Sequence, residues 1–284
     1  MTKKFLESKI KSVYDDFINE SWCDLNGKDL NTDGYNSLVY QQKYILKYYG
    51  AYFCELYEMY EDFFNTFTGK TVNILSLGCG SGVDCEALNR VVIDLKLNIT
   101  INYVGIDIVD WSYRPQFDWA TFKTMCVSKL KIKDIKHVHL FVFPKSLTEL
   151  ELNTLRLIGN LISESNKNDC VYFLNTYVTD YANDSNRIDG IRQFGIIHGI
   201  MKNNDWKCMT SPSEYYYKTR QNWLGYSYDF FKLPDEVKPF VEKLKDSCNN
   251  HNRSKKCMNC DIDFIPILTG RYLAFNLLGY KRLQ

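Results

Sequence analysis

The sequence predicts an α/β fold with a doubly wound, mostly parallel sheet, and two observations carry this prediction. Short apolar runs alternate with helical patterns from residue 72 to residue 211, as in chains whose parallel strands are joined by helical crossovers. The first of these runs breaks into a glycine-rich loop, and the second ends in the carboxylate of Asp107. With 284 residues, 45% of them hydrophobic, the chain can bury about three quarters of its unfolded surface. One large domain with additions is therefore expected.

Hydrophobic periodicity gives the elements in chain order. Residues 1–68 are expected to be helical with a polar break at 24–34, because apolar residues recur at intervals of three and four. The expected strands cover residues 72–78, 102–108, 124–127, 138–143, 170–174, 206–209 and 271–278. The expected helices between them cover residues 84–96, 118–123, 147–163 and 187–201. The long segment before the last strand exceeds any hairpin turn, so it is expected to be an insertion with a helix at 234–246.

The helix expected at 42–64 carries two neighbouring stripes of apolar residues. One stripe has the spacing of a face that packs on a core. The other places Tyr44, Tyr48 and Tyr52 four residues apart, as an aromatic ridge. Two interpretations stay open: the ridge packs inside the protein, or Tyr48 or Tyr52 closes over a ligand as part of a lid.

The strongest signal is the loop of Gly78, Gly80 and Gly82 followed by Asp107 on the next strand. Glycines let the main chain turn tightly and approach a ligand, and the helix after the loop begins with free N–H groups. An acid at the end of the second strand can accept hydrogen bonds from both hydroxyls of a ribose. Nicotinamide enzymes use a Gly-x-Gly-x-x-Gly spacing, but here position 83 is Val and the spacing is Gly-x-Gly-x-Gly.

The order of elements and this loop resemble the class I S-adenosylmethionine-dependent methyltransferases, over residues 72–211 and the final strand. The resemblance implies a seven-stranded Rossmann-like sheet whose last strand is antiparallel and lies beside the sixth. It also implies roles for the residues around the loop. Those expected at the cofactor, which would be S-adenosyl-L-methionine, are Tyr48, Gly78, Cys79, Gly80, Gly82, Asp84, Asp107, Ile108, Trp111, Ser128, Phe143 and Pro144.

Within that set the implied roles differ. The glycines would line the methionine and ribose, Ile108 and Trp111 would flank the adenine, and Ser128 would meet its edge. The family often has an acid two residues before the first glycine. Ser76 stands there in this chain, and Asp84 is the candidate to replace it.

The acceptor is expected at the ends of the fourth and fifth strands, because open sheets bind ligands at their carboxyl edge. The residues expected to bind it are Lys145, Ser146, Asn175, Tyr177 and Asp180. Asp180, Tyr177 and His198, in falling order, are candidates for a base, although none is assigned as catalytic. The Asn/Asp-Pro-Pro-aromatic motif of many amino-methylating enzymes is absent from the end of the fourth strand.

Cys248, His251, Cys257 and Cys260 form a C-x2-H-x5-C-x2-C pattern in the insertion. Two close pairs that each hold one side of a tetrahedral ion are typical of a structural zinc site. The surrounding residues are too polar to fold by burial, so zinc would supply the free energy of ordering. The alternative is four unrelated side chains in a loop.

These observations predict an α/β fold with a helical N-terminal extension and a zinc-knuckle insertion before the last strand. The expected parts are a helical extension or lid at 1–68, a cofactor-binding domain at 69–211 and 266–284, and an insertion at 212–265. The predicted function is methyl transfer to a small molecule, peptide or RNA. The alternatives are transfer of another group from the same cofactor, such as the aminocarboxypropyl group, and a non-catalytic module that binds protein or nucleic acid.

Composition bears on partners and location. A formal net charge of +1 gives no global reason to expect a polyanion, so nucleic acid is not favoured, whereas a protein could bind through 212–265. The N-terminus lacks the apolar core of a signal peptide, and no run reaches the roughly 18 apolar residues of a membrane helix. The ten cysteines therefore indicate reduced thiols or metal ligands, and a cytoplasmic location without membrane association is expected.

Overall fold

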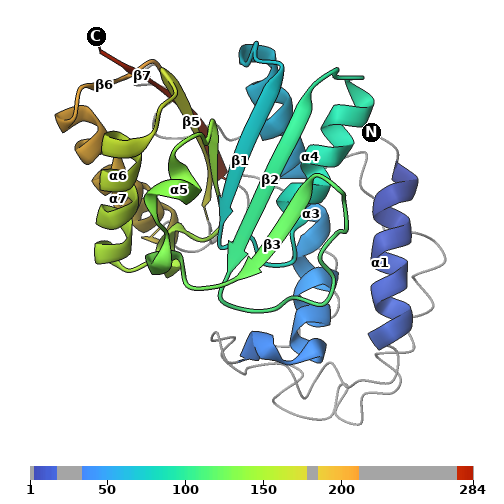
Figure 1. Cartoon of the computed structure of the whole chain (residues 1–284). Coiled ribbons are helices and arrows are strands. Elements are labelled where there is room, and N and C mark those ends of the chain that lie inside the picture. The colour runs from blue at the N-terminus through green and yellow to red at the C-terminus, as the bar shows by residue number, and fades with distance from the viewer. Residues whose placement is uncertain (1–2, 18–33, 178–184, 211–273, 284) are drawn as a thin grey trace.

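The computed structural model describes residues 3–17, 34–177, 185–210 and 274–283, and its centre is a seven-stranded sheet (Figure 1). The strand order is β3-β2-β1-β4-β5-β7-β6. The strands are β1 Thr71–Leu77, β2 Thr100–Asp107, β3 Ala120–Thr124, β4 Leu140–Pro144, β5 Cys170–Tyr177, β6 Trp206–Cys208 and β7 Ala274–Arg282. Only β7 is antiparallel to its neighbours, β5 and β6. The predicted doubly wound sheet with an inserted antiparallel last strand is therefore confirmed.

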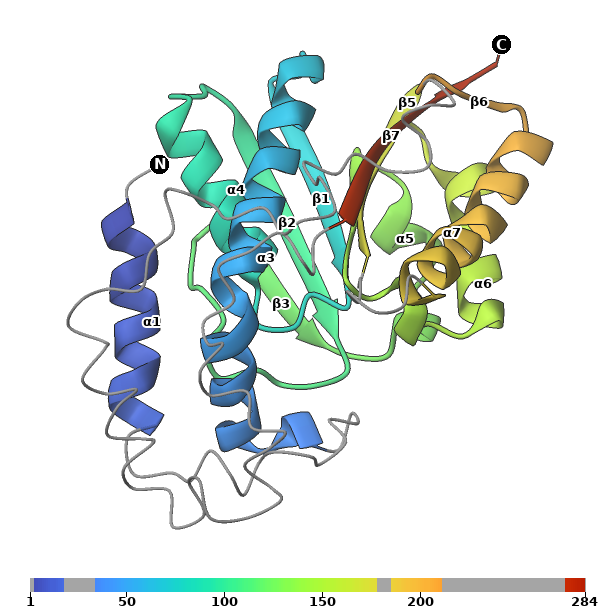
Figure 2. The same cartoon turned by 180° about the vertical axis from the view of Figure 1, so that it is seen from behind.

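Helices cover both faces of the sheet, as the two opposite views show (Figures 1 and 2). On one face lie α1 Lys3–Phe17, α3 Leu38–Thr66 and α4 Val83–Asp94, and on the other α5 Ile132–Ile135, α6 Leu152–Ser165 and α7 Ser185–Asn203. Strand β4 shows why both faces are apolar. Leu140 and Val142 belong to the first core, whereas Phe141 and Phe143 belong to the second. This alternation is the period of two expected of a strand buried on both sides.

The N-terminal helices pack into the first core. Ile10, Val13, Tyr14 and Phe17 of α1 are buried, and their spacing puts them on one face of the helix. Helix α3 contacts both α1 and α4 and joins the same core. The division into an extension at 1–68, a cofactor-binding domain and an insertion stays a prediction, and residues 212–265 lie outside the described ranges.

One local prediction is wrong. Residues 118–123 were expected to be helical and 124–127 to be a strand, but β3 occupies Ala120–Thr124, and a short 3₁₀ helix, η2, follows at Val127–Lys129. The cause is that β3 is an edge strand whose residues are all exposed or half-buried. Such a strand lacks the continuous apolar run that marks the buried strands, so its signal is weak.

Several boundaries also differ from those predicted. The helix expected at 147–163 is divided into a short 3₁₀ helix, η3 Leu147–Glu149, and α6, while β5 and β7 both extend beyond their expected ends. Another 3₁₀ helix, η1 Gly34–Asn36, precedes α3. In the ranges that the structure describes, no helix has the length and apolarity to cross a membrane.

Candidate functional site at the carboxyl edge of the sheet

The loop between β1 and α4 needs glycine at three positions. Gly78, Gly80 and Gly82 have φ angles of 72°, 52° and 73°, in the left-handed region that other residues rarely adopt. A Cβ on Gly78 would lie 2.5 Å from the Cβ of Ser146, and one on Gly82 would lie 2.8 Å from Pro115. The loop backbone is therefore packed closely and held in one conformation.

Asp107 ends β2 and binds this loop directly. Its Oδ2 accepts a 2.7 Å hydrogen bond from the Gly80 N–H, and its Oδ1 accepts a 2.9 Å bond from the Val109 N–H. The Gly78 and Cys79 N–H groups donate to the carbonyl of Ile106, the residue before Asp107. Each carboxylate oxygen has two lone pairs, so each of the two oxygens can still accept a hydrogen bond from a ligand hydroxyl. The predicted pairing of loop and acid is thus present.

The connection from β2 to β3 is tied to the loop by Arg114, which the sequence analysis missed. Its Nε donates to the Gly80 carbonyl at 3.2 Å, and its Nη2 donates to the Val109 carbonyl at 2.8 Å. The guanidinium also lies over the ring of Phe122. Its side-chain partner, Asp110, lies four residues before it and is exposed, so the sequence shows only an ordinary surface pair, and the contacts with the two backbone carbonyls leave no pattern of residue types.

Gln41 was also not predicted, because its side chain contacts backbone groups, which leave no pattern of residue types. Its Nε2 donates to the carbonyls of Tyr35 and Asp110, and its Oε1 accepts from the Ser112 N–H at 2.9 Å. It therefore fixes the first turn of α3 to the segment after β2.

The aromatic ridge of α3 lies beside this segment. The centroid of the Trp111 ring is 5.2 Å from those of both Tyr35 and Tyr44, and Tyr48 stacks on Tyr52 at 5.3 Å. Trp111 is buried against Gly80, and its Nε1 has no hydrogen-bond partner in the described part of the chain. The predicted neighbours Tyr48 and Trp111 thus belong to one aromatic cluster next to the loop.

Other predicted cofactor residues are placed less directly. Ile108 is 59% exposed, next to Asp107. Ser128 is exposed in η2, with its hydroxyl 3.0 Å from the Cys126 sulfur. Phe143 is fully buried in the second core, under α6 and α7, whereas Pro144 at the end of β4 is half-buried. Phe143 therefore serves packing in this structure.

Asp84 lies in the core beneath the loop. It is fully buried in the first turn of α4, and its Oδ2 accepts a 2.8 Å bond from the Tyr103 hydroxyl. Burial raises the pKa of Asp84 to about 6, although the Ser76 and Tyr103 hydroxyls oppose this shift. Asp84 was expected to replace the acid that the family often has at the position of Ser76, but the structure gives its carboxylate no exposed surface through which a ligand could contact it.

At the ends of β4 and β5 the predicted acceptor residues have different surroundings. The Lys145 Nζ lies 2.7 Å from the carboxylate of Glu55. Glu55 is a residue of α3 that the sequence did not indicate as part of a site. The Ser146 hydroxyl donates to the Leu77 carbonyl, so it supports the glycine loop. Asn175 is fully buried inside the sheet and donates from Nδ2 to the Asn276 side chain on β7. Tyr177 is buried against Gly190 of α7.

Of the candidate bases, Asp180 lies outside the described residues. His198 lies on α7, where its Nδ1 is 2.7 Å from the hydroxyl of Tyr280, a residue of the second core. The α3 ridge packs on the first core, so His198 is on the other face of the sheet from it.

The four predicted zinc ligands, Cys248, His251, Cys257 and Cys260, also lie outside the described residues. Within the described ranges, no group of three or more His, Cys, Asp and Glu side chains could hold a metal ion.

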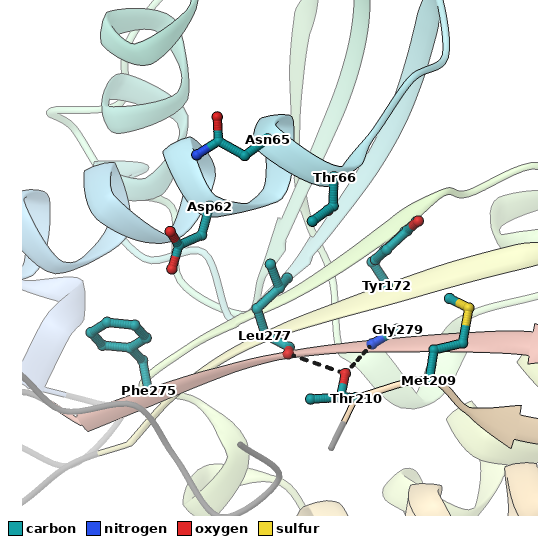
Figure 3. Close-up of a pocket in the computed structure, with 9 residues that line it drawn as sticks. All are labelled: Asp62, Asn65, Thr66, Tyr172, Met209, Thr210, Phe275, Leu277 and Gly279. Carbon is teal, nitrogen blue, oxygen red and sulfur yellow. Dashed lines mark hydrogen bonds between the residues drawn. The ribbon is translucent and has the colours of Figure 1, made fainter. Parts of the chain in front are cut away.

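A separate cavity of about 440 Å³ lies between the last turns of α3 and strand β7 (Figure 3). Asp62 and Asn65 lie on the α3 side, and Leu277 points from β7 toward them. The residues that line it are Asp62, Asn65, Thr66, Tyr172, Met209, Thr210, Phe275, Leu277 and Gly279. Tyr172 is near the amino end of β5, whereas the glycine loop follows the carboxyl end of β1. The cavity is therefore distinct from the site around Asp107.

Comparison with known proteins was made for sequence and for structure. No protein-family model matches the chain, and no curated protein does. Among solved structures, the plantazolicin methyltransferase BpumL in complex with SAH is similar at 12% identity, covering 98% of this chain and 100% of its own, with a TM-score of 0.46.

Two further structures are similar at the same level. A cyclopropane-fatty-acyl-phospholipid synthase-like protein from Lactobacillus casei has 14% identity, covers 97% of this chain and 99% of its own, and has a TM-score of 0.43. A TehB-like SAM-dependent methyltransferase from Corynebacterium glutamicum has 11% identity, covers 81% of this chain and 88% of its own, and has a TM-score of 0.39. Because these TM-scores lie below 0.5, the assignment of the fold rests on the strand order. That order, with β7 antiparallel between β5 and β6, is the one expected from the resemblance, and the chain has a seven-stranded Rossmann-like fold.

Proposed function

We propose that this protein binds S-adenosyl-L-methionine and transfers its methyl group to an acceptor. The observation that carries the proposal is the 2.7 Å hydrogen bond from the Gly80 N–H to Asp107 Oδ2, which joins the loop and the acid at the carboxyl edge of neighbouring parallel strands. Ligands of open α/β sheets bind at this edge, where the strand order reverses, here between β1 and β4.

The residues around the loop fit the proposed cofactor. Three glycines in the left-handed region leave the loop without the side chains that would separate its backbone from a ligand. Asp107 keeps two acceptor oxygens for a ribose, and the apolar ring of Trp111 packs against Gly80 beside them, where an adenine is proposed. The full proposed set is Tyr48, Gly78, Cys79, Gly80, Gly82, Asp107, Ile108, Trp111, Ser128 and Pro144. When bound, the cofactor supplies an activated methyl group, so the protein chiefly has to align it with an acceptor.

Calorimetric titration of the purified full chain tests this proposal. S-adenosylhomocysteine, the product of methyl transfer, should bind with a 1:1 stoichiometry, whereas NAD should not bind, because the loop lacks the third-glycine spacing of nicotinamide enzymes. Absence of binding by both S-adenosylhomocysteine and S-adenosylmethionine would contradict the proposal. Release of methylthioadenosine from S-adenosylmethionine would instead support transfer of another group.

The acceptor site is proposed at the ends of β4 and β5, around Lys145. Lys145 precedes Ser146, whose Cβ packs against Gly78 of the loop, and its Nζ lies over the ring of Tyr52 on α3, which supports this location. Zinc bound by Cys248, His251, Cys257 and Cys260 is also proposed, on the spacing of these residues alone. Metal analysis of protein purified without added zinc should find about one ion per chain. Less than half an equivalent would count against the site.

A further inference from the structure

Lys145 is held in an unusual position at the end of β4. Its backbone has a φ of 60°, which is uncommon for a residue with a side chain, and its N–H donates to Thr176 Oγ1 at 2.8 Å. Its Nζ donates to the Tyr177 carbonyl at 2.7 Å and contacts both oxygens of Glu55, at 2.7 and 2.9 Å. The same Nζ lies 4.9 Å from the centroid of the Tyr52 ring. Lys145 is thus fixed by strand β5 and helix α3.

The pair formed by Lys145 and Glu55 is almost completely removed from water. The side chain of Lys145 is 7% exposed and that of Glu55 is 0% exposed. Removing two opposite charges from water is costly even when they are paired. The ionised form of the pair, ammonium with carboxylate, is therefore closer in free energy to the neutral form, amine with carboxylic acid, than it would be in water. In keeping with this, burial raises the pKa of Glu55 to about 7 and lowers the pKa of Lys145, and each partner opposes the shift of the other.

This pair adjoins the cofactor loop. The residue after Lys145 is Ser146, whose Cβ occupies the space that a Cβ on Gly78 would need. From Tyr52, aromatic contacts lead through Tyr44 to Trp111, which packs against Gly80. A buried pair that is able to exchange a proton therefore stands beside the proposed methyl donor.

We propose that Lys145 Nζ, supported by Glu55, accepts the proton that a methyl acceptor with an O–H or N–H group loses. This inference rests on the proposed function. In the transfer, the bond from sulfur to the methyl carbon breaks, its electrons stay on sulfur, and the acceptor oxygen or nitrogen forms the new bond. The acceptor's proton goes to Lys145 Nζ as the proton of Lys145 passes to Glu55. Before transfer, the pair holds one titratable proton, on the Lys145 ammonium, and Glu55 is a carboxylate. After transfer, Lys145 is again an ammonium and Glu55 is a carboxylic acid, whose proton later passes to water.

Competitive acetylation of the full chain with acetic anhydride tests the protonation and the location of Lys145 without an acceptor. Only the neutral amine reacts, so the extent of labelling against pH, read by peptide mass spectrometry, reports the titration of each lysine. Among the described residues, Tyr52 and Glu55 of α3 face Lys145, and β5 contributes a backbone carbonyl. Glu58 bears on the titration of the pair through Glu55. The exposed Lys96 serves as the internal reference.

We expect Lys145 to reach half-labelling at a lower pH than the exposed Lys96, because burial disfavours the charged form of Lys145. Bound S-adenosylhomocysteine should slow the labelling of Lys145 several-fold and leave Lys96 unchanged. Glu55→Gln removes the opposite charge and should lower the half-labelling pH of Lys145 further. Glu58→Gln, which changes another buried carboxylate one turn away on α3, should shift it less.

Three results would overturn the inference. They are an unlabelled Lys145, a labelling profile that matches Lys96, and labelling that bound S-adenosylhomocysteine does not slow. A lysine that a small reagent cannot reach cannot take a proton from an acceptor either. If Glu55→Gln does not fold, the wild-type profile and its protection still decide the matter. Calorimetry separates the two proposals, because loss of S-adenosylhomocysteine binding rejects the proposed function, whereas binding without protection rejects only the role of Lys145.

Discussion

At the scale of single residues, the site is built from side chains that hold the backbone. Asp107 accepts a hydrogen bond from the Gly80 N–H, and Arg114 donates one to the Gly80 carbonyl. Because a glycine loop has no side chains of its own to fix it, such contacts set its conformation. The sequence indicated Asp107, since an acid at the end of a strand is a recognisable pattern. It did not indicate Arg114, which binds the backbone carbonyls of Gly80 and Val109, or Glu55, whose partner Lys145 is far away in the chain.

A prediction at this scale concerns Asp84, whose pKa burial raises from its ordinary 3.8 to about 6. The unfolded chain loses this proton first, so the folded state loses stability as the pH rises from about 4 to about 6. The increase in the pKa of Asp84 on folding corresponds to a loss on the order of 3 kcal/mol in the free energy of unfolding. Asp84→Asn should therefore raise the free energy of unfolding at pH 8, and the gain should shrink at pH 4. Urea unfolding at both values measures this, and an equal effect at both would argue against a buried charge.

At the scale of elements, the sequence predicted the buried strands well and the edge strand badly. β1, β4 and β5 are apolar on both faces, so continuous hydrophobic runs marked them. β3 carries only half-buried and exposed residues, and its sequence did not separate strand from helix. The ridge of Tyr44, Tyr48 and Tyr52 was found from helical spacing alone, but only the folded chain shows that it meets Trp111.

The glycine loop gives a second prediction, with a matched control in α7. Gly78→Ala needs a positive φ and puts a Cβ 2.5 Å from that of Ser146, so it should cost about 3 kcal/mol of stability and weaken binding of S-adenosylhomocysteine. Gly199→Ala in α7 has nothing within 4 Å of its added Cβ, and should stabilise by about 1 kcal/mol. Thermal unfolding and calorimetry of both variants test this. Equal stability of the two would contradict the strained loop.

At the scale of the whole molecule, two cores hold the helices on either side of the sheet (Figure 2). The sequence predicted the alternation of strands and helices, and the resemblance supplied the strand order. Neither could show that α1 contributes fully buried residues to the core shared by α3, α4 and the sheet, because that contact joins distant segments. The N-terminal helices therefore bear on the stability of the whole fold.

Phe17→Ala tests this contribution. Phe17 is fully buried, so its loss should reduce the free energy of unfolding by about 3 to 5 kcal/mol and lower the midpoint of the single transition. Lys11→Ala, at an exposed position of the same helix, should change it by less than about 0.5 kcal/mol. A separable extension would instead leave the main transition of the Phe17 variant unchanged in chemical denaturation.

The central claim is that the loop and Asp107 together hold S-adenosylmethionine, and calorimetry of Asp107→Asn with S-adenosylhomocysteine tests it most directly. The exposed Asp118, in the same connection between β2 and β3, provides the control variant Asp118→Asn. Loss of hydrogen bonds between a charged group and the ribose predicts binding weaker by about 10-fold or more for Asp107→Asn. Asp118→Asn should bind as the wild type does. Equal affinity for the wild type and a folded Asp107→Asn would contradict the account.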